Sequence, residues 1–162
     1  MARRSITYNQ LEERIHMYQM DLKEAHRYFK PSQYDLVTCN PPYFKTNQQH
    51  QHQIDAHKIA RHEIMCTLAD CCYAARHLLK QGGRFIMVHR AERLMDVLSH
   101  MRTYQIEPKK IYFIYSKLDK AAQTIVVEGR KGGNQGLEIQ PPFYIYNKDG
   151  TYTEEMREIY YG

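Results

Sequence analysis

Five consecutive residues, Asn40-Pro41-Pro42-Tyr43-Phe44, carry the groups that a site for a planar amine requires. The Asn40 side chain and the Pro41 backbone each offer a carbonyl oxygen, and the two prolines restrict the geometry of these acceptors. Two acceptors can bind both N–H groups of an exocyclic amine, which turns the nitrogen lone pair toward an incoming methyl group. Tyr43 and Phe44 offer aromatic faces on which a base stacks. The motif therefore predicts methylation of an amino group without a strongly basic catalytic side chain.

A rigid turn is the alternative interpretation of the same residues. Asn before Pro is a common turn starter, and Pro141-Pro142 in this chain shows that a proline pair needs no chemical role. The position of the motif favours a site, because it directly follows Tyr34–Cys39, a strand pattern with β-branched residues in its middle. Ligands of open α/β sheets bind outside the carboxyl ends of the strands.

Three further groups of residues have competing interpretations. The histidines near Cys66 match no zinc spacing, so a polar loop and ordinary helix residues are favoured and no metal is expected. Arg61 either contacts RNA or forms a helix-surface ion pair. A basic and aromatic stretch is either a nucleic-acid face or a solvated sheet rim. The histidines are His50, His52, His57 and His62, and the stretch comprises Lys109, Lys110, Tyr112, Phe113, Tyr115, Lys117, Lys120, Arg130 and Lys131.

The composition limits the class of protein. The 162 residues carry a formal net charge of +5, which is compatible with a nucleic-acid partner but common without one. The sequence has no run of roughly 18 apolar residues and no apolar signal core, so neither a membrane span nor secretion is expected. The four cysteines lack a C-x-x-C pair, which favours reduced thiols in the cytoplasm. The first glycine is Gly82, which excludes a glycine-rich nucleotide loop before that residue.

Alternating helix and strand patterns position the motif. They predict an α/β fold with a mostly parallel sheet and an antiparallel last pair of strands. Gly82 is expected to cap the longest helix, Gly129–Gly136 to form a flexible link, and Thr151 with Glu154 to cap the last helix. The expected helices are 1–12, Leu22–Phe29, 54–80, Ala91–Arg102 and a short one after Thr151; the expected strands are Ile15–Met20, Tyr34–Cys39, Arg84–His89, Lys110–Ser116 and Gln123–Glu128, with an extended edge segment over Leu137–Tyr146.

Several of these segments together resemble a known family. They are DLVTCNPPYF, IARHE (59–63), LLKQGGRF (78–85) and the run GLEIQPPFYIYNKDGTYTEEMREIY near the C-terminus. They are similar to class I S-adenosylmethionine-dependent methyltransferases of the tRNA1(Val) adenine-N6 group over essentially the whole chain. The resemblance implies a Rossmann-like sheet, S-adenosylmethionine as methyl donor, an adenine in RNA as target, with a valine tRNA as the best known substrate, and a cytoplasmic location.

The resemblance also assigns roles to individual residues. Asn40 and Pro41 would accept the hydrogen bonds of the target amine, Pro42 would be the rigid spacer, and Tyr43 the stacking face. Asp21 would accept from the adenine amine of the cofactor and Leu22 would supply a backbone N–H, with Asn40 also counted at the cofactor site. Phe44 and Arg61 complete the expected substrate-binding residues.

The sequence departs from the family pattern at its beginning. Family members start with a strand, a glycine-rich loop, a helix and a second strand, whereas this sequence starts in the helix that follows. We therefore expect an N-terminally incomplete single domain, inactive by itself, with a catalytically silent module that binds RNA or a protein as the alternative. Its parts would be a leading helix–strand–helix over 1–33, a four-stranded core sheet over 34–130, and a C-terminal strand and helix over 137–162.

The expected incompleteness has a consequence for the sheet. In the family, the first two strands separate the strand Ile15–Met20 from the strand Tyr34–Cys39. Without them Tyr34–Cys39 becomes an apolar edge, which proteins ordinarily avoid. Residues 1–33 are therefore expected to be displaced, swapped with another copy, or docked along this edge, and a homodimer through the edge is an expected partner. An edge left bare in a monomer would contradict this expectation.

Overall fold

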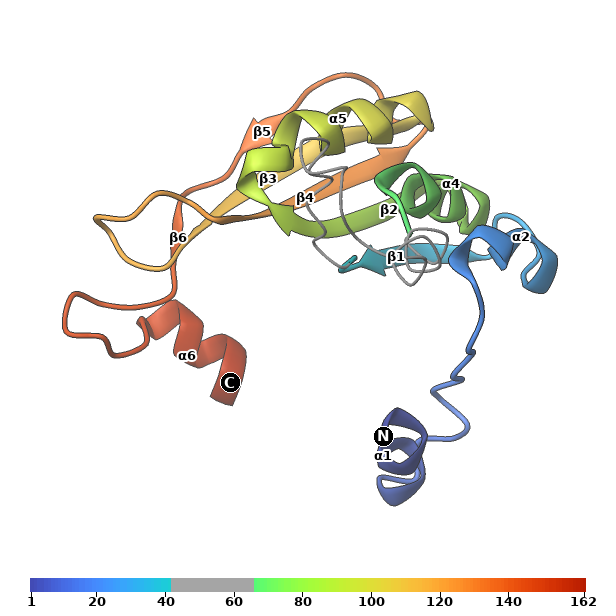
Figure 1. Ribbon diagram of the computed structural model, residues 1–162, viewed down its shortest axis with the longest axis horizontal. Coiled ribbons are helices and arrows are strands. Elements are labelled where there is room, and N and C mark those ends of the chain that lie inside the picture. Colours follow the sequence, from blue (N-terminus) through green and yellow to red (C-terminus); the bar gives the residue numbers. More distant parts are fainter. Residues whose placement is uncertain (42–65) are drawn as a thin grey trace, which may run out of the picture.

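The computed structural model describes residues 1–41 and 66–162. These residues form one six-stranded sheet with helices packed against it (Figure 1). In chain order the elements are α1 (Ala2–Tyr8), η1 (Leu22–Glu24), α2 (Ala25–Tyr28), β1 (Tyr34–Cys39), α4 (Leu68–Leu78), β2 (Leu79–Arg90), η2 (Ala91–Arg93), α5 (Leu94–Thr103), β3 (Ile106–Tyr115), β4 (Thr124–Lys131), β5 (Glu138–Ile139), β6 (Phe143–Tyr144) and α6 (Glu154–Tyr161).

The sheet is mixed, with the strand order β1-β2-β4-β3-β5 and with β6 also paired to β3. β1 and β2 are parallel, whereas β4 runs antiparallel to both β2 and β3. The two short strands β5 and β6 pair parallel with β3, so the proline-containing segment lies at an edge as predicted. These pairings confirm the α/β class and the antiparallel last pair of long strands.

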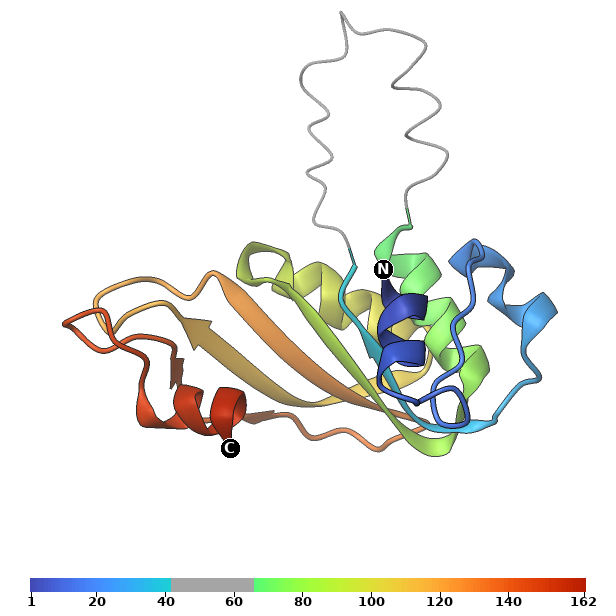
Figure 2. The same cartoon turned by 90° about the horizontal axis from the view of Figure 1, so that it is seen from below.

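The main hydrophobic core lies between the sheet and two helices. α4 and α5 cover the same face of the sheet, and their packing together is visible in Figure 2. Val97 and Met101 of α5 are fully buried against Phe85 and Met87 of β2. The helix predicted over Ala91–Arg102 is confirmed, with a 3₁₀ turn as its first part.

The single long helix expected over 54–80 is wrong. Thr67 has an extended backbone and caps α4, so no helix continues through this residue, and residues 54–65 lie outside the described part. At its other end α4 stops at Leu78, because Leu79 is fully buried in an extended conformation and pairs with Tyr34 of β1. Gly82 has the expected positive φ of 75°, but it lies inside β2 and caps no helix.

Ile15–Met20 is not a strand. Its alternation of apolar and polar residues predicts a half-buried strand, but within residues 1–41 and 66–162 no strand lies beside it to complete a ladder. Met17 and Tyr18 are consequently exposed, and the Tyr18 ring meets that of Phe29 edge-on, with 5.0 Å between the ring centroids.

Two local predictions in the C-terminal half also need correction. Gly129 belongs to β4 and is buried. A Cβ added at this position would lie 2.7 Å from Cγ2 of Ile106 and would collide with the Met101 side chain. β4 continues to Lys131, so the connection that follows it begins later than expected. The last helix is capped by Thr153, whose hydroxyl accepts from the Met156 backbone N–H, whereas Thr151 bonds to Asp149 in the preceding turn.

The outer edge of β1 has no strand partner within residues 1–41 and 66–162. None of the described residues pairs with that edge, and Tyr34 and Leu36 remain 40% and 43% exposed. The first part of the leading segment is displaced, since α1 has no buried residue and lies away from the sheet (Figure 1), whereas η1 and α2 contact α4. Displacement is one of the three expected arrangements, and coverage of the edge by a second copy stays a prediction. Asp35 of this edge strand pairs with Lys80 at 2.8 Å.

Candidate functional site

Three chain segments meet at the carboxyl end of β1. Leu22 from η1, Cys39 from β1 and Cys66 before α4 all pack against the buried core at this end. Both η1 and β1 contact α4, which holds them beside each other. The charge of Asp21 is close enough to raise the pKa of the Cys66 thiol. The fold thus brings the Asp21–Leu22 turn and the start of the Asn40 motif to one end of the molecule.

Asn40 and Pro41 are the two described residues of the predicted motif. The ladder between β1 and β2 ends at the pair Cys39 and Met87, and Asn40 follows immediately. Pro41 is buried whereas Asn40 is exposed, so the proline anchors the turn and leaves the amide at the surface. Pro42, Tyr43, Phe44 and Arg61 lie outside the described residues, as do the four histidines of the metal alternative.

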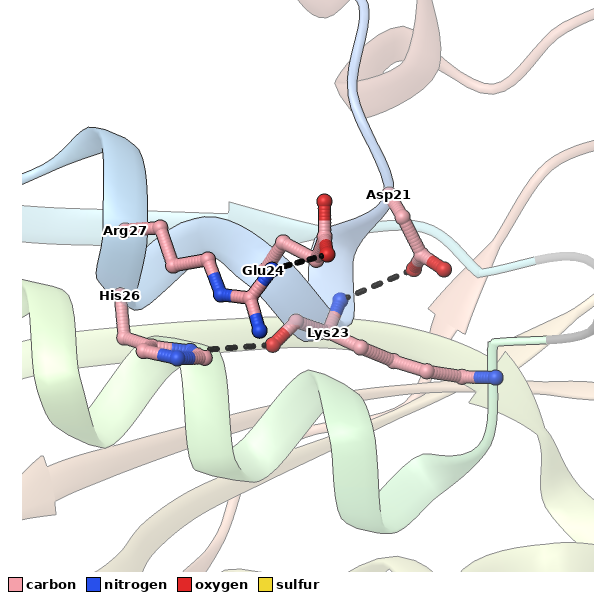
Figure 3. A network of polar contacts seen from close by, with 5 residues as sticks. All are labelled: Asp21, Lys23, Glu24, His26 and Arg27. Atoms are coloured by element: carbon pink, nitrogen blue, oxygen red, sulfur yellow. Dashed lines mark hydrogen bonds and ion pairs between the residues drawn. The ribbon is translucent and has the colours of Figure 1, made fainter.

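Asp21 caps η1 at the position expected for a cofactor contact. Its Oδ1 accepts the backbone N–H of Lys23 at 3.0 Å, as Figure 3 shows. The same short turn is braced by an ion pair from Arg27 to Glu24 at 2.8 Å and by His26 Nδ1 against the Lys23 carbonyl at 3.1 Å. A carboxylate has about four acceptor positions, so one cap contact leaves capacity for a further donor. Asp21 is exposed and can meet one.

A cluster of thiols next to Asn40 was not predicted from the sequence. Cys66 Sγ lies 3.3 Å from Cys71 Sγ, and Cys39 packs against the same buried core. Hydrogen bonding with Cys71 lowers the pKa of Cys39, while burial raises the pKa of Cys66. The only sequence signal was that one cysteine directly precedes the motif. Among the residues that the structure describes, no group of His, Cys, Asp or Glu side chains is arranged to hold a metal.

His89 is a second residue that the sequence interpretation missed. It lies at the carboxyl end of β2, two positions after the partner of Cys39, and is buried. Its Nδ1 accepts the Arg90 backbone N–H at 2.9 Å. Burial lowers the pKa of His89, and the nearby Arg93 guanidinium lowers it further. The signal that could have identified it is its inward position in the strand alternation Phe85, Met87, His89.

Tyrosines gather where the chain leaves the sheet at its C-terminal end. Tyr115 of β3 contacts Tyr144 of β6 with 5.3 Å between ring centroids. Tyr146, Tyr152 and Tyr160 form a stack, with centroid distances of 5.2 and 5.8 Å. These rings extend the aromatic character of β3 beyond the stretch identified in the sequence.

No helix within residues 1–41 and 66–162 is long and apolar enough to cross a membrane.

Comparisons with known proteins place this arrangement among methyltransferases. No family model matches the sequence. The chain is 24% identical over 98% of its length to a tRNA1(Val) (adenine(37)-N6)-methyltransferase of Dyadobacter fermentans, covering 65% of that protein. It is 26% identical over 91% of its length to the enzyme of the same name from Actinobacillus pleuropneumoniae, covering 59% of it.

A solved structure described as a predicted O-methyltransferase from Agrobacterium tumefaciens superposes with a TM-score of 0.76 at 16% identity. The superposition covers 98% of this chain and 69% of that one. The chain thus spans about 59–65% of the length of the two curated relatives. Its fold is that of the class I methyltransferases, and its sequence is similar to the tRNA1(Val) adenine-N6 methyltransferases.

Proposed function

We propose that this chain forms the substrate-amine side of an S-adenosylmethionine-dependent methyltransferase that modifies N6 of an adenine in RNA, with a tRNA as the substrate. The observation that carries the proposal is the Asn40-Pro41-Pro42-Tyr43 sequence at the carboxyl end of β1, with Pro41 buried and Asn40 exposed. The names of the curated relatives support the RNA target, and the net charge of +5 is compatible with it. The cytoplasm, where tRNA is modified, is the proposed compartment.

The proposed reaction requires the protein mainly to position the amine, the base and the methyl donor. The Asn40 side-chain carbonyl and the Pro41 backbone carbonyl accept the two N–H groups of the adenine amine, which exposes its lone pair. S-Adenosylmethionine, when bound, supplies an electrophilic methyl group, so the amine loses its proton after attack and no strong base is required. Pro42 keeps the acceptors rigid, Tyr43 and Phe44 stack on the base, and Arg61 contacts the RNA.

The residues near η1 fit the adenosine end of this cofactor. Asp21 is exposed, keeps acceptor capacity, and lies at the same end of the fold as Asn40. We assign its carboxylate to the cofactor's adenine amine and the Leu22 backbone N–H to the same ring, with Asn40 as a further residue at the cofactor site. Asp21→Asn should therefore weaken cofactor affinity without removing the substrate motif.

The experiment that tests the proposal follows methyl transfer to an unmodified tRNA transcript. Asn40→Ala should lower the rate by about 100-fold or more, since a positioned acceptor of the reacting group is lost. Calorimetry should find a much smaller loss of affinity for S-adenosylmethionine, because Asp21 and Leu22 are still present to hold the cofactor. Asn134→Ala is the matched control, because Asn134 lies in the turn after β4 and contacts Lys109 only through its backbone carbonyl. Normal methylation by Asn40→Ala would overturn the role of Asn40.

A second candidate is a catalytically silent module that binds RNA or a protein. The observation that favours it is the unpaired outer edge of β1, where a second copy can pair or swap a strand to give a homodimer. This candidate predicts tRNA or protein binding with no measurable affinity for S-adenosylmethionine. Calorimetry of the wild-type chain therefore separates the two candidates, and sedimentation of the same sample reports the dimer.

A further inference from the structure

Three tyrosine rings stack at the end of the sheet where β3 ends. Tyr146, Tyr152 and Tyr160 lie nearly parallel, with interplanar angles of 14° and 13° between successive rings. The segment is fixed there because the Tyr146 backbone N–H donates to the Ser116 carbonyl at 3.0 Å. α6, which carries Tyr160, follows β6 and lies apart from α4 and α5 (Figure 1). The tyrosine stack is therefore attached to the sheet and not to the two core helices.

The edge of the sheet that carries the stack is also the edge that carries Asn40. β1 and β2 are parallel, and β4 runs antiparallel to both β2 and β3, so β3 points in the same direction as β1. Asn40 follows the carboxyl end of β1 and the tyrosines follow that of β3, with β2 and β4 between them. An RNA whose target adenine lies at Asn40 would therefore meet the tyrosines with other nucleotides.

Ordinary packing explains the stack but not the residue at its outer end. Tyr146 and Tyr152 are half-buried, so their rings help to hold α6 to the sheet. Tyr161 follows Tyr160 with its ring tilted by 45°, and its side chain is 77% exposed. The burial of apolar surface therefore does not account for a tyrosine at position 161, and most of its ring is accessible to a ligand.

Tyr161 lines a surface hollow that offers the groups a nucleotide requires. The volume of the hollow is about 440 Å³, and Thr151, Tyr152 and Arg157 complete its lining. Among the described residues no carboxylate forms an ion pair with Arg157, so its guanidinium is available to a phosphate. The two tyrosine rings offer faces on which a base stacks.

Two carboxylates restrict where a phosphate can lie. Glu154 and Glu158 line an adjoining hollow together with Tyr152 and Arg157. Their charges repel a phosphate on that side, so Arg157 is expected to bind one on the side of Tyr161. The ligand that fits is therefore one nucleotide unit of an RNA, with its base on the tyrosines and its phosphate on Arg157. Because only one phosphate is bound, stacking should supply most of the affinity.

We propose that Tyr152, Arg157 and Tyr161 form a second RNA contact, which stacks an unpaired base and binds its phosphate while the target adenine lies at Asn40. Unpaired bases of RNA loops stack on aromatic rings, which bases inside a duplex cannot do. Every base has a stacking face, so the contact selects an unpaired nucleotide and not a base sequence. The role of the contact in methylation rests on the proposed function; binding of single-stranded RNA does not.

The test measures binding of a fluorescent oligouridylate of about twelve nucleotides to the full chain by anisotropy. This probe has no adenine, so it reports on the hollow without the Asn40 site. Tyr161→Ala should weaken binding about tenfold or more, because a stacking face is lost, whereas Tyr161→Phe should bind like the wild type. Arg157→Gln should reduce the slope of log affinity against log salt concentration by about 0.7, the value for one single-strand phosphate.

The matched controls are Tyr8→Ala and Arg4→Gln. Both residues are exposed in α1, which lies away from the sheet (Figure 1), so both variants should bind the oligouridylate like the wild type. Circular dichroism should find Tyr161→Ala folded, because α6 has no buried residue. If that variant loses α6, the salt slope of Arg157→Gln still decides the question.

Three results would overturn the proposal: wild-type affinity in Tyr161→Ala, an equal loss in Tyr8→Ala, or an unchanged salt slope in Arg157→Gln. Equally tight binding of an RNA duplex would overturn the selection of an unpaired base. A chain that binds the oligouridylate through Tyr161 but never methylates tRNA would overturn the proposed function alone. An unchanged KM for tRNA in Tyr161→Ala would overturn the role of the contact in methylation.

Discussion

The environment of His89 differs from that of an ordinary surface histidine because two features oppose its charge. The side chain is 6% exposed at the end of β2, and the Arg93 guanidinium lies close enough to disfavour a second positive charge. Both features lower the pKa of the folded-state imidazole below its ordinary value of 6.5. His89 is therefore held neutral in the folded chain beside the end of the sheet that carries Asn40.

This environment makes the free energy of unfolding depend on pH. Because the folded-state pKa lies below 6.5, the stabilising contribution is complete above pH 6.5 and is lost as the pH falls through the folded-state pKa. Urea titrations should show a slope of at most about 1.4 kcal/mol per pH unit just below pH 6.5. His89→Gln should flatten this slope, whereas His16→Gln, at an exposed position, should keep it. An unchanged slope in His89→Gln would contradict the assignment.

At the scale of single residues, the sequence predicts Asn40 and Pro41 as site residues because their functional groups and their place after a strand are local properties. It missed Cys71 and His89, which are unremarkable in their own segments. Cys71 becomes notable only through Cys39, 32 positions earlier, and this approach depends on how β1 packs against α4.

Among the elements, α4 depends on a cap that interrupts the predicted long helix. The Thr67 hydroxyl accepts from the Asp70 backbone N–H at 3.1 Å, and the Asp70 carboxylate accepts from the Thr67 backbone N–H at 2.8 Å. This reciprocal pair satisfies N–H groups that the first turn of a helix leaves unpaired. The apolar spacing over 54–80 did not predict this interruption, because hydrophobic periodicity depends on the spacing of apolar side chains and not on the capping residue.

Removing the two threonine caps should have unequal effects. Thr67→Ala should lower the free energy of unfolding by about 1 kcal/mol, because α4 supplies four buried residues to the folded chain. Thr153→Ala removes the equivalent cap of α6, which has no buried residue, and should leave the global unfolding transition unchanged. Denaturant titration followed by circular dichroism measures both variants. Equal losses would mean that α6 is part of the cooperative unit.

For the whole molecule, packing divides the chain into a cooperative sheet and peripheral ends. The buried residues come mainly from α4, β2, α5, β3 and β4, while α1 contributes none. A seven-residue helix without a buried residue is marginal in water, because the cost of starting a helix is not recovered.

Amide hydrogen exchange should reveal this division directly. We expect residues 2–20 to exchange close to the rate of an unfolded peptide, and β2 and β4 to be the most protected segments. Protection of α1 that grows with protein concentration would instead show that the leading segment is covered in a dimer. Protection of α1 equal to that of β2 in a monomer would contradict the packing described above.

The sequence by itself determined the strand Tyr34–Cys39, the motif after it, a helix within Ala91–Arg102 and the antiparallel pairing of β3 with β4. These features depend on side-chain periodicity, turn chemistry and short connections, all of which act between near neighbours. Tertiary structure decided that Ile15–Met20 remains unpaired, that Gly129 is buried, and that Asp21, Asn40 and the thiol cluster share one end of the fold. Those outcomes depend on which distant segments pack together, and local patterns do not specify such contacts.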